Sequence, residues 1–203
     1  MILDKNGVMS ALSALGDHLE QTSGNAIEFV VCGGSALQAL GLINRTTRDV
    51  DVLAILEKHA DEEAVLFSAQ PLPDKVLQAA AIVARDVGLP AEWLNPGPTE
   101  LLSEGLPEGL VSRLHSKTFG SRLTVHFISR LDQICLKMYA VLNGGGPRHL
   151  ADMQLLQPSN DEVLIAARWC LTQDASEVFP GLVSSFLIKV GYPNVAEQLK
   201  TDG

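Results

Sequence analysis

Cysteine is scarce in this sequence, and long apolar runs are absent. Its 203 residues include three cysteines, Cys32, Cys135 and Cys170, which lie far apart and lack the spacing of a Cys-x-x-Cys metal site. We expect buried thiols in a reducing compartment. No apolar run approaches the length of a membrane span, and the N-terminus lacks a basic segment followed by an apolar core. These absences predict a cytoplasmic protein with no membrane partner.

Positive charge is also in short supply. Lys and Arg total 15 against 24 Asp and Glu, which gives a net charge of −9. This balance argues against a broad basic surface for nucleic acid, so RNA is a disfavoured partner that would need a basic cluster at one cleft. A small anionic substrate fits better, because a local basic cluster and a metal ion can offset the overall sign.

Apolar residues make up 46% of the chain, enough for a full core, and the most informative pattern lies near the N-terminus. Residues 27–31 form an apolar run that predicts a buried strand. Residues 33–35 are Gly-Gly-Ser, and 36–40 have a short helical pattern. A polar, basic loop over 44–48 follows, and 49–53 read Asp-Val-Asp-Val-Leu, which predicts a second strand.

Asp49 and Asp51 are two residues apart on the second predicted strand, so their side chains leave the same face. Two neighbouring carboxylates repel each other, and a divalent cation removes that cost. Mg²⁺ is held by one or two carboxylates plus substrate phosphates. Upstream, Gly33 and Gly34 leave room for a phosphate, and a helix starting near Ser35 offers unpaired N–H groups. The stretch therefore predicts a phosphate cradle and a clamp for Mg²⁺ or Mn²⁺.

Each of these signals also has a purely structural interpretation. Gly-Gly after a strand is often a tight turn, and Ser35 is a good helix N-cap. Asp-x-Asp is common on solvated strands, where Asp49 and Asp51 would be ordinary acids paired with Arg45 and Arg48. Alone, each signal is weak, and the functional interpretation depends on their order along the chain.

That order resembles the signature of the nucleotidyltransferase superfamily of the DNA polymerase β type: a hydrophobic strand, Gly-Gly or Gly-Ser, then Asp-x-Asp about a dozen residues later. It looks most like the bacterial branch that includes the AbiEii-type abortive-infection toxins and uncharacterised relatives. The signature covers residues 29–53, and weaker similarity extends to about residue 156. The resemblance implies a bacterial enzyme that moves a nucleoside monophosphate from a nucleoside triphosphate to an unknown acceptor. A toxin role would add a cognate antitoxin-like partner.

The resemblance also implies roles for particular residues. Asp49 and Asp51 would be the catalytic metal ligands. Lys137 falls in a predicted helix over 130–142, and Arg148 and Asp152 are four apart in a second one, so they meet on one helical face. A surface ion pair there would be worth little. By resemblance, Lys137 and Arg148 contact the triphosphate and Asp152 positions one of them. The residues expected to bind the nucleotide are Gly33, Gly34, Ser35, Arg48, Asn95, Lys137, Arg148 and Asp152.

Two positions leave alternatives open. Trp93 and Asn95 precede Pro96, which favours a structured loop; the tryptophan either plugs the core edge while Asn95 caps a turn, or Asn95 reaches the cleft. Many nucleotidyltransferases carry a third carboxylate in a later strand, where this sequence offers His126 instead. A histidine can act as a base, or be an ordinary polar residue on a half-exposed strand. The alternative function is therefore an inactive nucleotide-binding or protein-interaction module with the same fold.

The expected fold is α/β, with a small mixed sheet of nucleotidyltransferase type flanked by helices and followed by a C-terminal helical region. Strands are predicted near 27–32, 50–56 and 111–128, and the last of these reads as a hairpin. The hairpin argues against the runner-up, a doubly wound parallel sheet. A change of character at Pro158 predicts a domain over residues 1–157 and a helical region over 158–203.

Overall fold

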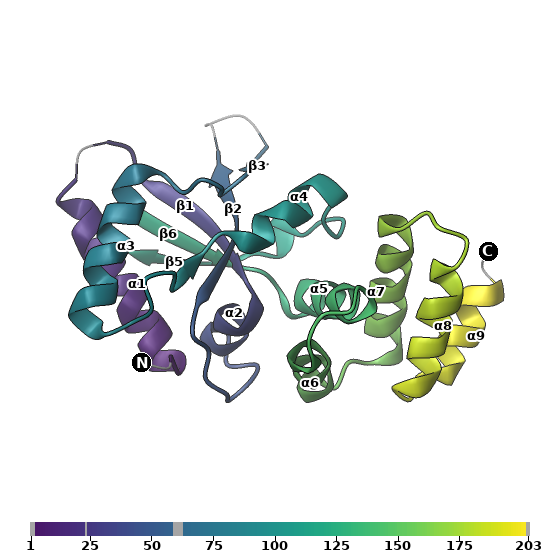
Figure 1. Ribbon diagram of the computed structural model, residues 1–203. Helices are drawn as coiled ribbons and strands as arrows, with labels where there is room; N and C mark the ends of the chain where they lie inside the picture. Colours follow the sequence, from purple (N-terminus) through teal and green to yellow (C-terminus); the bar gives the residue numbers. More distant parts are fainter. Residues whose placement is uncertain (1–2, 23, 59–62, 202–203) are drawn as a thin grey trace. The chain divides into compact units, whose positions relative to one another are not determined.

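The structure is a computed structural model that describes residues 3–22, 24–58 and 63–201. The chain divides into two compact units, which meet in sequence between Ser129 and Arg130 (Figure 1). The first unit is α/β and the second is helical. The sequence predicted the division after residue 157, which lies inside the second unit. The reason is that the helices over 130–142 and 147–156 belong to the same compact unit as the C-terminal helices.

The first unit contains one mixed sheet with helices and short 3₁₀ turns around it. Long helices form where apolar residues recur at helical spacing, as in the one that ends at Gly88, a glycine with φ +69°. In chain order the elements are α1 (Lys5–Glu20), β1 (Ile27–Cys32), α2 (Gly33–Ala39), β2 (Val50–Glu57), β3 (Val65–Phe67), α3 (Asp74–Val87), β4 (Leu94–Asn95), η1 (Gly97–Glu100), α4 (Leu101–Glu104), η2 (Val111–Arg113), β5 (His115–Phe119) and β6 (Leu123–Phe127).

The sheet has the strand order β3-β2-β1-β6-β5, and β4 pairs with β2 off this path. β1 is antiparallel to β2 and parallel to β6, while β5 and β6 form an antiparallel hairpin. The predicted mixed sheet is confirmed, and the parallel alternative is wrong. A connection as short as residues 120–122 can only join antiparallel strands.

An irregularity in the β1–β2 pairing decides where the acidic residues lie. Val30 pairs with Ala54, but Val31 pairs with Val52, so Leu53 is an extra residue that bulges out of the ladder. The shifted register sets Asp51 directly opposite Cys32, the last residue of β1. A carboxylate is thereby placed beside the turn where the chain leaves β1 for α2.

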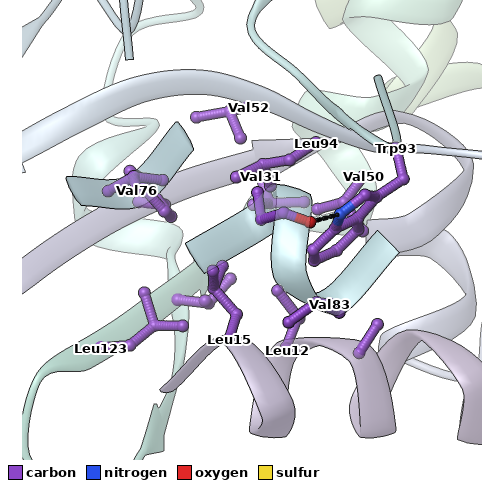
Figure 2. Packing of buried hydrophobic residues seen from close by; sticks show 14 of the residues in the cluster. Leu12, Leu15, Val31, Val50, Val52, Val76, Val83, Trp93, Leu94 and Leu123 are labelled. Carbon is purple, nitrogen blue, oxygen red and sulfur yellow. Dashed lines mark hydrogen bonds between the residues drawn. The ribbon is translucent and has the colours of Figure 1, made fainter. Parts of the chain in front are cut away.

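One face of the sheet packs against α1 and α3, and Figure 2 shows the centre of this core. Leu12 and Leu15 of α1 and Val76 and Val83 of α3 meet alternate residues of the strands. Trp93 is fully buried among them, and its indole N–H donates to the backbone oxygen of Ala80 at 3.0 Å. The interpretation of Trp93 as a core residue is confirmed.

The second unit is a set of helices: α5 (Arg130–Leu142), α6 (Pro147–Leu156), α7 (Asn160–Gln173), α8 (Phe179–Lys189) and α9 (Pro193–Thr201). A capping box is present at the start of α7, where the Ser159 hydroxyl accepts from the Glu162 N–H and the Glu162 carboxylate accepts from the Ser159 N–H. Arg130 holds the same carboxylate at 2.9 Å, which joins α5 to α7.

Among the residues that the structure describes, none of the helices combines the length and the apolar character needed to cross a bilayer.

Candidate functional site

Asp51 is held in place by an amide from another strand. β4 pairs with β2 so that Asn95 lies opposite Asp51. The Asn95 Nδ2 donates to Asp51 Oδ1 at 3.1 Å, and the Asn95 Oδ1 accepts from the N–H of Gly97 at 2.9 Å. Because both ends of the amide are engaged, the rotation of Asn95 is restricted, and its Nδ2 is aimed at one oxygen of the Asp51 carboxylate. Asn95 therefore caps a turn, as one alternative held, and also orients the acid.

Gly33 is the residue that allows the Asp51 carboxylate to lie against the backbone. Its φ is +70°, a conformation that side chains rarely adopt. A Cβ at Gly33 would stand 2.2 Å from Asp51 Oδ2, well inside contact distance. The sequence predicted that this glycine leaves room for a phosphate. In the structure, the space beside it is occupied by the protein's own carboxylate.

The basic loop returns over the second glycine. A Cβ on Gly34 would lie 3.1 Å from the Arg45 Nη2 and 3.2 Å from the Thr47 Oγ1. The Thr47 hydroxyl donates to Asp49 Oδ1 at 3.0 Å, and Asp49 immediately precedes β2. The turn after β1 therefore brings Asp49, Asp51 and Arg45 into one group of charged side chains, which we call the Asp51 cluster, with Gly33, Gly34, Thr47 and Asn95.

The sequence suggested that Ser35 caps a helix, but in the structure it does not. α2 begins two residues earlier, at Gly33, with Cys32 in the N-cap position. The Ser35 hydroxyl instead donates to the Cys32 backbone oxygen at 3.3 Å, and the residue is fully buried. Its side chain is therefore used inside the fold, and the structure offers no surface of Ser35 to a nucleotide.

His126 lies apart from the Asp51 cluster. It is opposite Val30 of β1, and β1 separates β6 from β2, so two strand spacings of about 5 Å each stand between the histidine and Asp51. Continuing the register by one residue places Ile128, a fully buried apolar residue, in the row of Asp51. His126 thus does not replace a third carboxylate at this cluster.

The described residues include no group of three or more His, Cys, Asp or Glu side chains that could hold a metal ion. The donors that the cluster does offer are carboxylate oxygens, which suit a hard cation such as Mg²⁺. A magnesium ion bound through Asp49 and Asp51 would have to complete its shell with water and phosphate oxygens.

The remaining predicted residues belong to the second unit, except for Arg48, which is exposed in the loop before β2. Lys137 of α5 and Asp152 of α6 form an ion pair with an Nζ–Oδ2 distance of 2.8 Å. Their side chains are only 7% and 0% exposed, whereas Arg148 is exposed in the first turn of α6. Asp152 therefore pairs with Lys137 of the neighbouring helix. The sequence predicted that Asp152 positions one of the two cations, and Lys137 is the one that it contacts here.

Sequence reasoning also missed Thr47 and Glu28. Thr47 fixes Asp49, and a Thr two residues before an acid is a recognisable local signal. Glu28 accepts a hydrogen bond from His126 across two strands, 98 residues apart in sequence. Only the register of the sheet shows this contact.

We found no protein-family model that matches the chain, and no curated protein or solved structure that matches it significantly.

Proposed function

We propose that the Asp51 cluster is the active site of a metal-dependent nucleotidyltransferase that moves a nucleoside monophosphate from a nucleoside triphosphate to an acceptor. The observation that carries the proposal is the way both acids are held. Asp49 accepts from a threonine hydroxyl and Asp51 from an asparagine amide. Such hydrogen bonds orient a carboxylate, which is what a bound cation needs.

Asp49 and Asp51 are the residues that would hold Mg²⁺. When bound, the ion would neutralise charge on the triphosphate and on the departing pyrophosphate. Asn95 donates to one oxygen of the Asp51 carboxylate, and Thr47 donates to one oxygen of Asp49, so each acid has a hydrogen bond that helps to orient it. Arg45, beside Gly34, supplies positive charge within the same unit.

A second candidate function is an inactive nucleotide-binding or protein-interaction module. One observation favours it: within residues 3–22, 24–58 and 63–201, no third acid, histidine or cysteine joins Asp49 and Asp51 in a group that could hold a metal ion. Without a third carboxylate, the cluster has no obvious base to take a proton from an acceptor hydroxyl. Such a module would bind nucleotide without turning it over.

Isothermal titration of each of the four nucleoside triphosphates, with and without Mg²⁺, tests the proposal. We expect Mg²⁺-dependent binding to wild type, loss of binding in Asp51→Asn, and unchanged binding in Asp17→Asn, which removes an exposed acid from α1. Absence of binding to wild type would overturn both candidates that involve nucleotide. Release of pyrophosphate from a bound triphosphate separates the enzyme from the inactive module.

A further inference from the structure

A second group of polar side chains lies on three neighbouring strands of the first unit. Glu28 belongs to β1, His126 to β6 and Ser116 to β5. Their neighbours along β1 and β6 are apolar and point into the core with α1 and α3: Ile27, Phe29, Val125 and Phe127. Because side chains alternate along a strand, the three polar residues occupy the opposite face of the sheet. Ser116 and His126 are direct partners across the β5–β6 hairpin.

The two hydrogen bonds of His126 fix which nitrogen carries the proton. Its Nε2 lies 2.8 Å from Glu28 Oε2, and its Nδ1 lies 2.7 Å from the Ser116 hydroxyl oxygen. An ionised carboxylate only accepts hydrogen bonds, so Nε2 of the imidazole is the protonated nitrogen. In the neutral ring Nδ1 is then an acceptor, and it receives the hydroxyl proton of Ser116.

Burial differs along this chain of hydrogen bonds. The imidazole of His126 is 10% exposed and the Glu28 side chain 39%, whereas Ser116 is an exposed residue of the edge strand. The base is thus shielded from water while the hydroxyl is open to a reagent. A carboxylate, an imidazole and a hydroxyl in this order are the parts of a base-activated nucleophile.

We propose that Ser116, His126 and Glu28 form a nucleophilic site that accepts an acyl group from an activated ester. The Ser116 oxygen forms a bond to the ester carbonyl carbon as its proton passes to His126 Nδ1. The carbonyl–oxygen bond to the alcohol then breaks, and the alcohol leaves with that proton. Glu28 stabilises the transient imidazolium through Nε2–H. Water reverses the sequence, taking the acyl group as a carboxylic acid and returning the proton to Ser116.

The experiment uses a fluorophosphonate probe, which forms a stable bond to activated serines, and locates the label by peptide mass spectrometry. We expect wild type to be labelled at Ser116 and Ser116→Ala to lose that label. His126→Gln keeps the serine but removes the base, and should slow labelling by about a hundredfold or more. Ser112, an exposed serine whose hydroxyl donates to the Gly109 backbone oxygen, is the internal control and should stay unlabelled.

A double variant controls for damage to the fold. Ser116→Ala combined with Thr118→Ser keeps a serine on the same strand and face but places it opposite Thr124 instead of His126. Both changes are at exposed positions, and we expect no label at residue 118. The proposal is overturned if wild type is labelled at Ser116 no faster than at Ser112. It is equally overturned if His126→Gln, with an unchanged thermal melt, or the double variant reacts like wild type.

Discussion

Two aspartates, one in each unit, show how differently the same side chain can be used. Asp152 of α6 is completely buried and lies 2.8 Å from the ammonium group of Lys137. Asp51 of β2 is half-buried and accepts from the Asn95 amide, a neutral donor. An acid removed from water is held by an opposite charge, whereas one at the surface can be kept in place by neutral groups.

This difference in burial and in partners distinguishes residues with a structural role from candidates for a functional role among the predicted site residues. On resemblance alone, Lys137, Asp152 and Asp51 all had functional roles. The geometry makes the Lys137–Asp152 pair a link between two helices of the second unit, since both side chains are buried. It makes Asp51 an oriented acid beside a glycine turn. Removing one negative charge from each should therefore have opposite consequences for folding.

The largest expected effect is that of Asp152→Asn. The change keeps the shape of the side chain but leaves the Lys137 ammonium buried without its anionic partner, which should cost about 3–5 kcal/mol of unfolding free energy. Urea unfolding followed by circular dichroism measures it. The double variant Lys137→Met/Asp152→Leu removes both charges and should regain most of the loss. A matched change of an exposed lysine, Lys189→Met, should stay within about 0.5 kcal/mol. An Asp152→Asn effect as small as that control would contradict the structural role.

Gly33→Ala comes next, and Gly88→Ala is its matched control. The two glycines share nearly the same φ, +70° and +69°, but a Cβ at Gly88 meets nothing within 4 Å whereas one at Gly33 meets Asp51. Backbone strain alone should cost about 1–2 kcal/mol at either position. Gly33→Ala should cost more, because the Asp51 carboxylate must also move away from the Asn95 amide. If Gly33→Ala and Gly88→Ala lose the same unfolding free energy in urea, the Asp51 carboxylate moves away from the new Cβ without a measurable cost.

Glu162 allows a smaller test of charge pairing in the second unit. Burial works to raise the pKa of its carboxyl, but hydrogen bonds from the Ser159 backbone and from Arg130 outweigh burial and hold the pKa below its usual range. A depressed pKa in the folded state adds stability above the unfolded pKa of about 4.3, and this contribution is lost as the pH falls through the folded value. Glu162→Gln keeps a capping-box residue and should cost about 1 kcal/mol at pH 7.

The loss of unfolding free energy caused by Glu162→Gln should shrink towards zero by pH 3, because the wild-type Glu162 carboxylate is then losing its charge as well. Urea unfolding of both proteins at pH 7, 5 and 3 is the measurement. Glu197→Gln removes an exposed carboxylate of α9 and serves as the control for the general effect of charge. A difference that stayed constant from pH 7 to pH 3 would assign the loss to packing instead of to the carboxylate's charge.

Local periodicity predicted the elements that carry their own pattern. The range of α5 was correct to the residue, since an apolar stripe runs through the helix and a glycine follows it closely. The β5–β6 hairpin was expected from its alternation and from the turn at Gly120. β3 and β4 were missed, because three and two residues are too few to show a period.

The candidate site could be predicted only in part, because its residues are joined by long-range pairings. Asp49, Asp51 and Gly33 were found from their order along the chain. The Asn95 bond to Asp51 spans 44 residues, and the role of Gly33 beside that carboxylate depends on the bulge at Leu53. The sequence correctly predicted that His126 lies on a strand, and the resemblance placed that position at the acidic cluster. The register of the sheet instead puts His126 beside Glu28. The nucleotidyltransferase resemblance itself stays a prediction.

The smallest expected effect on folding is that of Asp51→Asn, the same substitution as the one at Asp152. An asparagine at position 51 keeps an Oδ1 that can accept from Asn95, so the hydrogen bond survives. Removing the charge also relieves any repulsion between Asp51 and Asp49. The apoprotein should therefore change by less than about 0.5 kcal/mol, or gain slightly. Thermal melts with Mg²⁺ and a nucleotide mixture then test the ligand. Wild type should gain about 2.7 kcal/mol at a hundredfold excess over the dissociation constant, and Asp51→Asn nothing. A clear loss in the mutant apoprotein, with no ligand-induced shift in wild type, would make Asp51 a structural acid like Asp152.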